Sequence, residues 1–215
     1  MTANPHLSTE TAIAGADDAA VAAVLVHGRD QDPEFMLEQL AGRLGLDGDV
    51  AYLLPRAADR SWYPGRFYDP MEDNEPWLGW SLEAIEAAVT RAGQSGRTLP
   101  SIALVGFSQG ACIVAELLAR RARPFGGAAI LTGALFGAAA QRMPAGALDG
   151  LPMFFGIATD DDWIPVDAVR DTVAAFQRAG ARCDLHVYDD EEHGINDDEV
   201  AAVRTLLTTL LERST

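Results

Sequence analysis

Short apolar runs alternate with amphipathic stretches along almost the whole chain, and this alternation limits the folds that the chain can adopt. The apolar runs are predicted to be strands, at residues 20–26, 50–54, 101–105, 127–131, 151–157 and 183–188. The stretches between them place apolar residues at helical spacing, at residues 33–44, 78–92, 111–123, 166–179 and 196–211. Strands that alternate with helices predict an α/β fold, with a mostly parallel sheet and helices on both of its faces.

The size and charge of the chain limit what it can bind. Its 215 residues suit one compact domain, and we expect a polar tail over residues 1–18 and a single domain over residues 19–215. The chain has 32 acidic and 16 basic residues, and every basic residue is arginine. The resulting net charge of −16 repels phosphate backbones, so nucleic acid is not an expected partner.

Nothing in the sequence predicts a stable insertion into a membrane. No apolar run approaches the roughly 18 residues that a membrane-spanning helix needs. Residues 1–20 have neither a basic start nor a long apolar stretch, so they do not resemble a secretory signal. We therefore expect a cytoplasmic protein, and the sequence does not indicate its oligomeric state.

Residues 106–110 read Gly-Phe-Ser-Gln-Gly and match the pattern Gly-x-Ser-x-Gly. They lie between a predicted strand and a predicted helix, which is the context in which this pattern forms a tight turn that exposes the serine. Such a turn crowds the positions two before and two after the serine, and both are glycine here, Gly106 and Gly110. Ser108 is therefore the candidate nucleophile, and an ordinary glycine-rich turn is the alternative.

A serine nucleophile needs a base, and the base needs an acid that orients it. In an open α/β sheet, active-site residues lie just beyond the carboxyl ends of the strands. Two histidines follow Ser108. His186 lies inside the predicted strand 183–188, whereas His193 lies in the loop after that strand. His193 is therefore the candidate base, and His186 is expected to be an ordinary strand residue.

The orienting acid is expected in the loop after the strand predicted at residues 151–157. This loop contains three consecutive aspartates, Asp160, Asp161 and Asp162. For each of them the alternative is a solvated loop charge or a helix cap. Position alone leaves all three open.

An oxyanion hole needs two backbone N–H groups. One is expected from Gln109, which follows the nucleophile and begins the helix, and the other from Arg29 in the turn after the first predicted strand. His27 precedes this turn and could be taken as a catalytic histidine. Its place before the nucleophile in the chain favours a structural role instead.

The segment from residue 55 to residue 77 combines prolines with five aromatic side chains. Its prolines prevent a long helix, and a connection of this length in a compact domain usually has a function. We expect this segment to lie over the carboxyl ends of the strands and to form one wall of a substrate pocket. Trp62 and Phe67 are its candidate pocket residues, and a loop packed on the sheet edge is the alternative.

Neither the acidic runs nor the cysteines predict a metal site. The runs at residues 189–192 and 197–199 lack the residue spacing of a calcium-binding loop, so a solvated acidic surface is expected. Cys112 and Cys183 form no Cys-x-x-Cys motif and are expected to be reduced core thiols. A disulfide between them or a nucleophilic thiol is the alternative.

Taken together, these motifs resemble the α/β-hydrolase superfamily and, within it, the phospholipase/carboxylesterase family, which includes acyl-protein thioesterases and small predicted esterases. The resemblance covers the chain from about residue 20 onward. It rests on His27-Gly28, the pentapeptide at 106–110, the Asp-x-x-Ile-Pro pattern at 161–165 and His193-Gly194. It implies an α/β-hydrolase fold with no large cap domain, with Ser108 as nucleophile, Asp161 as acid and His193 as base. Its oxyanion positions fall on Arg29 and Gln109.

The function expected from these residues is the hydrolysis of carboxylic esters through an acyl-enzyme intermediate, with a small-molecule ester as substrate and no cofactor. One alternative is the same triad acting on acyl thioesters or lysophospholipids. A less favoured alternative is a non-catalytic binding protein on the hydrolase scaffold, which would need neither a triad nor the serine turn.

Overall fold

The computed structural model describes residues 3–137, 143–190 and 192–214. Within them, seven strands form one sheet in the order β1-β3-β2-β4-β5-β6-β7. The strands are β1 (Ala12–Gly15), β2 (Val21–Val26), β3 (Val50–Leu54), β4 (Ile102–Phe107), β5 (Gly127–Leu131), β6 (Pro152–Ala158) and β7 (Arg182–Tyr188). Only β1 runs antiparallel, against β3, and the other neighbours pair in parallel. The predicted mostly parallel sheet is confirmed.

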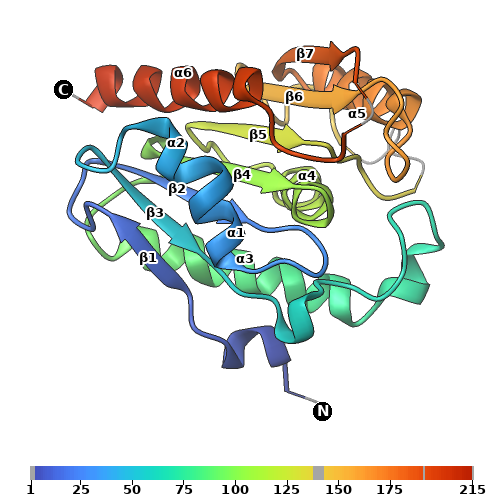
Figure 1. The fold of residues 1–215 in the computed structure, drawn as a ribbon, viewed down its shortest axis with the longest axis horizontal. Coiled ribbons are helices and arrows are strands. Elements are labelled where there is room, and N and C mark those ends of the chain that lie inside the picture. The colour runs from blue at the N-terminus through green and yellow to red at the C-terminus, as the bar shows by residue number, and fades with distance from the viewer. Residues whose placement is uncertain (1–2, 138–142, 191, 215) are drawn as a thin grey trace.

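Helices cover both faces of the sheet (Figure 1). One face packs against α3 (Trp77–Gly93), α4 (Gln109–Arg121) and α5 (Val166–Arg178). The other packs against α1 (Pro33–Met36), the π-helical turn Leu37–Ala41, α2 (Gly42–Leu44) and α6 (Asp197–Ser214). Short 3-10 turns occupy Pro5–Ser8, Ala58–Arg60, Met71–Asn74 and Leu99–Ser101. This layering explains why the central strands are apolar throughout, since both of their faces are buried.

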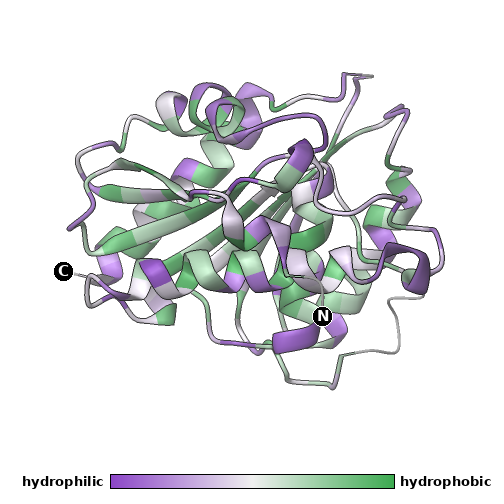
Figure 2. Ribbon diagram, turned by 90° about the horizontal axis from the view of Figure 1, so that it is seen from below, coloured by the Kyte–Doolittle hydropathy of each residue, from purple (hydrophilic) through white to green (hydrophobic). Residues whose placement is uncertain are grey.

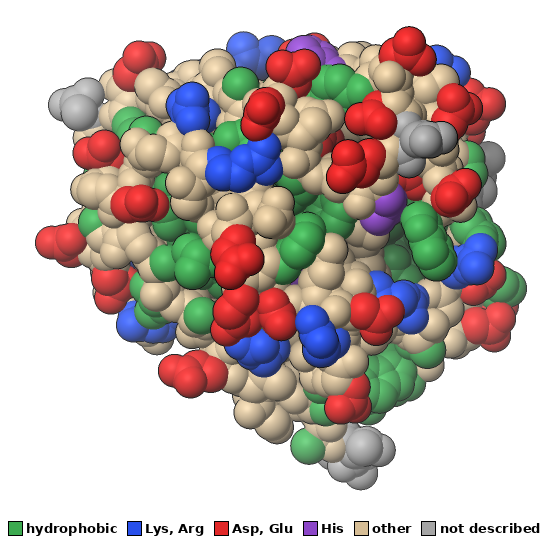
Figure 3. Space-filling model, viewed as in Figure 1, with side chains coloured by type: hydrophobic (Ala, Val, Ile, Leu, Met, Phe, Trp, Pro, Cys, Tyr) green, Lys and Arg blue, Asp and Glu red, His purple; other side chains and the backbone are tan. Residues whose placement is uncertain are grey.

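The apolar residues gather in the sheet and on the inner sides of the helices (Figure 2). Every side chain of β2, β3, β4 and β5 is buried. The edge strand β7 instead has mostly exposed or half-buried residues. Acidic side chains are scattered over the face of the molecule that Figure 3 shows, and they outnumber the basic ones there. Among the described residues no helix is both long and apolar enough to cross a membrane.

Part of the segment that we expected to be a polar tail belongs to the fold. The strand β1 pairs with β3 from Ala12–Leu54 to Gly15–Ala51. Before it, His6 is buried, and its Nδ1 accepts a hydrogen bond from the Ala58 N–H over 2.9 Å. The tail prediction over residues 1–18 is therefore wrong for this stretch. A strand of four residues with alternating burial is too short for its periodicity to stand out in a sequence.

The helix predicted after residue 32 begins as expected. The Asp32 side chain accepts a hydrogen bond from the Phe35 N–H over 3.2 Å, and Pro33 occupies the first turn, where its missing N–H costs nothing. A π-helical turn interrupts the helix before it ends at Gly45, whose φ of 66° suits glycine. In the parallel register, Val26 lies level with Gly106. The carboxyl ends of β2 and β4 are therefore adjacent.

Candidate active site

The turn between β4 and α4 holds Ser108 in an unusual backbone conformation, with φ of 52° and ψ of −118°. Both flanking glycines are required by space, although for different reasons. A Cβ on Gly106 would collide with the carbonyl oxygen of Gly110, as predicted, whereas a Cβ on Gly110 would collide with the carbonyl oxygens that end β2. The turn therefore presses against the neighbouring strand, and Ser108 projects at the carboxyl edge of the sheet.

The structure brings Ser108, His193 and Asp161 together in one hydrogen-bonded line. The Ser108 Oγ lies 2.8 Å from His193 Nε2, and His193 Nδ1 lies 2.7 Å from Asp161 Oδ2. The three residues come from the loops after β4, β7 and β6, as the rule for open α/β sheets predicts. His186 stays in β7, half exposed, beside Asp184.

The carboxylate of Asp161 is fixed on both of its oxygens. While Oδ2 faces His193, Oδ1 accepts hydrogen bonds from the backbone N–H groups of Trp163 and Ile164, each over 2.8 Å. Burial by itself would raise the pKa of Asp161, but the hydrogen bonds from His193 and from these two N–H groups outweigh it and hold the pKa below the ordinary value. The side chain is fully buried and ionised at neutral pH. Asp160 and Asp162 are exposed.

The turn after β2 leaves one backbone N–H available beside the nucleophile. The Gly28 N–H donates to Oε1 of Gln31 over 2.9 Å, and the Asp30 N–H donates to the Arg60 carbonyl over 2.8 Å. Within the described residues, the Arg29 N–H between them has no hydrogen-bond partner, and neither has the Gln109 N–H at the start of α4. The turn passes close to Ser108, since a Cβ on Gly28 would lie 3.1 Å from the Ser108 Cβ.

His27 has a structural environment. It is fully buried, its Nδ1–H donates to the Gly28 carbonyl over 2.7 Å, and its Nε2 accepts from the Ala57 N–H over 3.1 Å. Burial lowers its pKa to about 4, so the ring is neutral at neutral pH. Both ring nitrogens are occupied, which agrees with the structural role predicted for this histidine.

A pocket of about 550 Å³ opens beside Ser108 and His193. One wall is the stretch from Tyr63 to Asp69, and Trp163 and Ile164 also line the pocket, with the Trp163 ring next to the Arg66 guanidinium. The segment from residue 55 to residue 77 therefore contributes a wall to this pocket, and Phe67 lines it. Trp62 does not line the pocket. It is fully buried behind the wall, where its Nε1–H donates to the His27 carbonyl over 2.8 Å.

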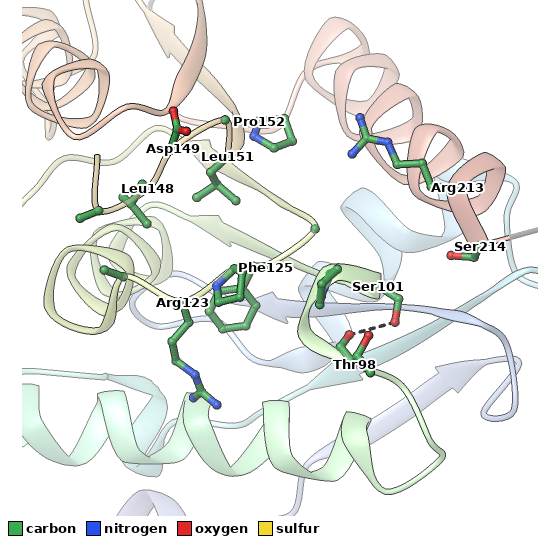
Figure 4. Close-up of a pocket in the computed structure, with 16 residues that line it drawn as sticks. Thr98, Ser101, Arg123, Phe125, Leu148, Asp149, Leu151, Pro152, Arg213 and Ser214 are labelled. Carbon is green, nitrogen blue, oxygen red and sulfur yellow. Dashed lines mark hydrogen bonds between the residues drawn. The ribbon is translucent and has the colours of Figure 1, made fainter. Parts of the chain in front are cut away.

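A second pocket, of about 530 Å³, lies at the opposite end of the sheet (Figure 4). Residues at the amino ends of β4, β5 and β6 contribute to its lining, among them Ser101 and Pro152. The side chains labelled in Figure 4 include no histidine and no cysteine, and the drawn hydrogen bond joins the Ser101 hydroxyl to the Thr98 carbonyl over 2.9 Å. Of these two pockets, only the first is lined by the candidate catalytic residues Ser108 and His193.

Comparison with known proteins gives the family. The model of the phospholipase/carboxylesterase family matches residues 50–211, about three quarters of the chain. The chain belongs to the phospholipase/carboxylesterase family. This confirms the resemblance seen in the sequence, and the protein is an α/β-hydrolase of an esterase family. No curated protein matches it in sequence.

Solved structures with the same fold superpose on most of the chain. A phospholipase/carboxylesterase from Dyadobacter fermentans is 28% identical, with a TM-score of 0.80 over 93% of this chain and 96% of the other. Esterase PE8 is 19% identical, with a TM-score of 0.77 over 93% and 98% of the two chains. A carboxylesterase from Mesorhizobium loti is 20% identical, with a TM-score of 0.70 over 88% and 89%. The last two comparisons establish the fold alone.

Both cysteines of this phospholipase/carboxylesterase family member are free thiols, as predicted. Cys112 is buried and contributes to the pocket lining, and its Sγ accepts a weak hydrogen bond from the Ala134 N–H over 3.4 Å. Burial raises the pKa of this thiol to about 11. A thiol that stays protonated at neutral pH is a poor nucleophile. Ser108, whose Oγ lies at hydrogen-bonding distance from His193, is therefore the stronger candidate of the two.

Three residues contribute to the site although the sequence alone did not single them out. Gln31 holds the turn after β2, Tyr63 begins the pocket wall, and Tyr68 stands half exposed at its outer end. No local pattern marks Tyr63 and Tyr68 as pocket residues, because they reach the site only once the loop at 55–77 has folded over the sheet. Gln31 acts within its own turn, through the Gly28 N–H.

The positions of Trp62 and Phe67 predict different effects of their substitution. Trp62→Ala should lower the free energy of unfolding by about 3–5 kcal/mol, because it empties a fully buried site. It should leave the ranking of ester substrates by acyl length unchanged. Phe67→Ala should instead favour bulkier acyl groups, since it enlarges the pocket. Urea denaturation and kcat/KM for a series of acyl esters test both. An unchanged acyl ranking in Phe67→Ala would contradict the assignment of this wall.

Glu199 lies behind the loop that carries His193. Its N–H donates to Oδ1 of Asn196 over 2.9 Å, and its Oε2 accepts from the Asn196 N–H over 3.1 Å, so the pair forms a capping box at the start of α6. The Glu199 side chain also lies directly against Gly156 of β6. It is 1% exposed, and burial raises its pKa from 4.5 to about 7.

This pKa predicts that Glu199→Gln stabilises the protein above pH 7. Because the folded-state pKa is raised, the stability that wild-type Glu199 contributes is complete below about pH 4.5 and is lost as pH rises through about 7. Glutamine keeps the capping acceptor and never ionises. The variant should therefore exceed the wild type by about 3 kcal/mol at pH 8 and match it near pH 4.5. Urea denaturation at the two pH values tests this, and an equal difference at both would refute it.

Proposed function

We propose that this protein hydrolyses carboxylic esters with Ser108 as nucleophile, His193 as base and Asp161 as orienting acid. The observation that carries the proposal is the hydrogen-bonded line from Ser108 Oγ through His193 to Asp161, with contacts of 2.8 and 2.7 Å. The line opens on a pocket of about 550 Å³, a size that suits a small-molecule ester. Membership in the phospholipase/carboxylesterase family supports the same reaction class.

The first half of the reaction forms an acyl-enzyme. Ser108 Oγ attacks the carbonyl carbon of the ester while His193 Nε2 takes the serine proton. The carbonyl oxygen becomes an oxyanion, which accepts hydrogen bonds from the N–H groups of Arg29 and Gln109. The intermediate then collapses: the carbon–oxygen bond to the alcohol breaks, and His193 gives its proton to the departing alcohol oxygen.

The second half releases the acid. A water molecule attacks the acyl carbon while His193 Nε2 takes one of its protons. The bond between the acyl carbon and Ser108 Oγ breaks, the serine regains the proton from His193, and the carboxylic acid leaves. The balance of this reaction is ester plus water to acid plus alcohol, and it calls for no cofactor.

Asp161 keeps His193 ready for both halves. Its carboxylate accepts the Nδ1–H, which leaves Nε2 free to take the proton of Ser108, and its negative charge stabilises the imidazolium that forms. The two backbone N–H groups on its other oxygen prevent the carboxylate from rotating away. A buried and ionised acid in this orientation suits a triad.

Labelling by a fluorophosphonate, with mass detection, tests the proposal. We expect one adduct on the peptide that contains Ser108, with no adduct in Ser108→Ala. A screen of oxygen esters and thioesters across acyl lengths then distinguishes ester hydrolysis from the thioesterase and lysophospholipase alternatives. Absence of both an adduct and turnover would overturn the proposal in favour of a non-catalytic binding protein.

A further inference from the structure

Residues 61–65 lead into the pocket wall, which they line from Tyr63 onward, and the Arg29 side chain binds the last three of them through their carbonyl groups. We refer to residues 61–65 as the wall segment. The guanidinium donates to the carbonyl oxygens of Tyr63 over 3.0 Å, of Pro64 over 3.1 Å, and of Gly65. Its central carbon also lies 5.8 Å from the centre of the Tyr63 ring. One side chain therefore binds three consecutive carbonyls of the wall segment.

The Gln109 side chain binds the same segment. Its Oε1 accepts a hydrogen bond from the Trp62 N–H over 2.8 Å, and its Nε2 donates to the Tyr63 carbonyl over 2.8 Å. The side chain is buried, 5% exposed, so these bonds are shielded from water. The carbonyl of Tyr63 thus accepts from both Arg29 and Gln109.

Arg29 and Gln109 also each have a backbone N–H close to Ser108 that has no hydrogen-bond partner within the described residues. In the proposed mechanism, each residue therefore supplies a backbone N–H to the oxyanion and uses its side chain to bind the wall segment. Because both side chains meet at one carbonyl, a shift of the wall segment would move both N–H groups. The geometry of the oxyanion hole is therefore coupled to the position of the pocket wall.

The wall segment is itself held firmly from behind. The Trp62 ring is fully buried, and its centre lies 5.0 Å from that of His27 and 5.3 Å from that of His6. The Trp62 carbonyl accepts a hydrogen bond from His6 Nε2 over 3.1 Å and another from the Ser81 hydroxyl. Because these buried contacts fix the wall segment, the side chains of Arg29 and Gln109 bind to a rigid part of the protein.

We propose that Arg29 and Gln109 are positioning residues. Their side chains bind the wall segment and thereby fix the positions of their own backbone N–H groups, which form the oxyanion hole. The inference rests on the proposed hydrolase function. Hydrogen-bond donors stabilise a developing oxyanion only when they are already in place, so a small displacement lowers the rate without weakening the binding of the substrate. These side chains act on the reaction through the backbone and touch no reacting atom.

Three variants test the inference: Arg29→Met, Gln109→Leu and the double variant. Each single variant should lower kcat by about 10- to 100-fold, which is less than the complete loss of an oxyanion donor, and change KM by less than about threefold. The double variant should lose little more than the worse single variant, because both side chains bind the same segment. Arg29→Lys, which keeps the charge and part of the donor set, should recover part of the lost kcat.

A second measurement reports how tightly each variant binds an analogue of the transition state. The inhibition constant of a trifluoromethyl ketone, which forms a tetrahedral adduct with a catalytic serine, should rise in proportion to the loss of kcat/KM in each variant. The thermal midpoint of each variant shows that it is folded. Arg56→Met is the matched control, since Arg56 begins the same loop but pairs with Glu34 at the surface, and it should keep full activity.

Several outcomes would overturn the inference. A raised KM with unchanged kcat would make Arg29 a substrate-binding residue, and losses that multiply in the double variant would show two independent roles. Full activity in both single variants would show that neither side chain is needed. A wild-type protein that labels with fluorophosphonate keeps the proposed function intact in each of these cases. If the wild type neither labels nor hydrolyses esters, the proposed function fails and this inference fails with it.

Discussion

Ser108→Ala is expected to lower kcat for ester hydrolysis by about a million-fold, the scale seen when a triad loses its nucleophile. The expectation follows from the geometry around Ser108, whose Oγ is the atom that faces His193 Nε2 over 2.8 Å. Alanine fits the space of serine and keeps the backbone of the turn. The thermal midpoint should therefore change little, and kinetics with the best ester from the substrate screen measure the loss.

The remaining activity of Ser108→Ala is informative as well. The N–H groups of Arg29 and Gln109 stay in place in this variant, so a residual rate above that of water is expected. Activity close to that of the wild type would exclude Ser108 as the nucleophile. Cys112, which also lines the pocket, would then be examined by its own alanine variant.

Asp161→Asn is expected to lower kcat by about ten-thousandfold, because an asparagine amide holds the imidazole in the wrong tautomer. The change preserves the shape of the side chain, so the loop should keep its fold. Asp160→Asn and Asp162→Asn are matched controls in the same loop, and both residues are exposed. Their activity should stay close to that of the wild type. A large loss in either control, with Asp161→Asn active, would show that the geometry around His193 has been assigned to the wrong carboxylate.

The pH dependence of activity offers an independent check on Asp161. Its pKa lies below the ordinary value, so the ionised form that holds His193 persists into mildly acidic solution and is lost only as pH falls through the lowered value. Titration of this carboxylate should therefore not limit kcat at neutral pH.

The alternation of strands and helices, and the serine turn, could be read directly from the sequence. The strands β2 to β5 are buried on both faces, so their apolar runs are continuous and easy to recognise. In a parallel sheet the carboxyl ends of the strands lie along one edge, so residues just after different strands meet there. That rule places Ser108 and His193 together although 85 residues separate them.

The choice among the three aspartates needed more than position. Asp161 faces His193 because its other carboxylate oxygen accepts the N–H groups of Trp163 and Ile164, which turns the side chain inward. The family pattern implied the same residue. The short strand β1 was missed, since its pairing with β3 depends on a partner that follows it in the chain.

By itself the sequence determined the fold class, the serine turn and the three residue types of the candidate triad, because each depends on local periodicity or on the edge that parallel strands share. Only the tertiary structure decided how the loop at residues 55–77 lies over that edge. The contacts that fix it join residues far apart in the chain, such as Arg29 with Tyr63, 34 positions apart, and Gln109 with Trp62, 47 positions apart. The loop has no internal periodicity, and its aromatic rings gain the same free energy from burial on either side of the wall. Packing against His27 therefore buried Trp62 and left Phe67 in the pocket, a distinction that no local pattern contains.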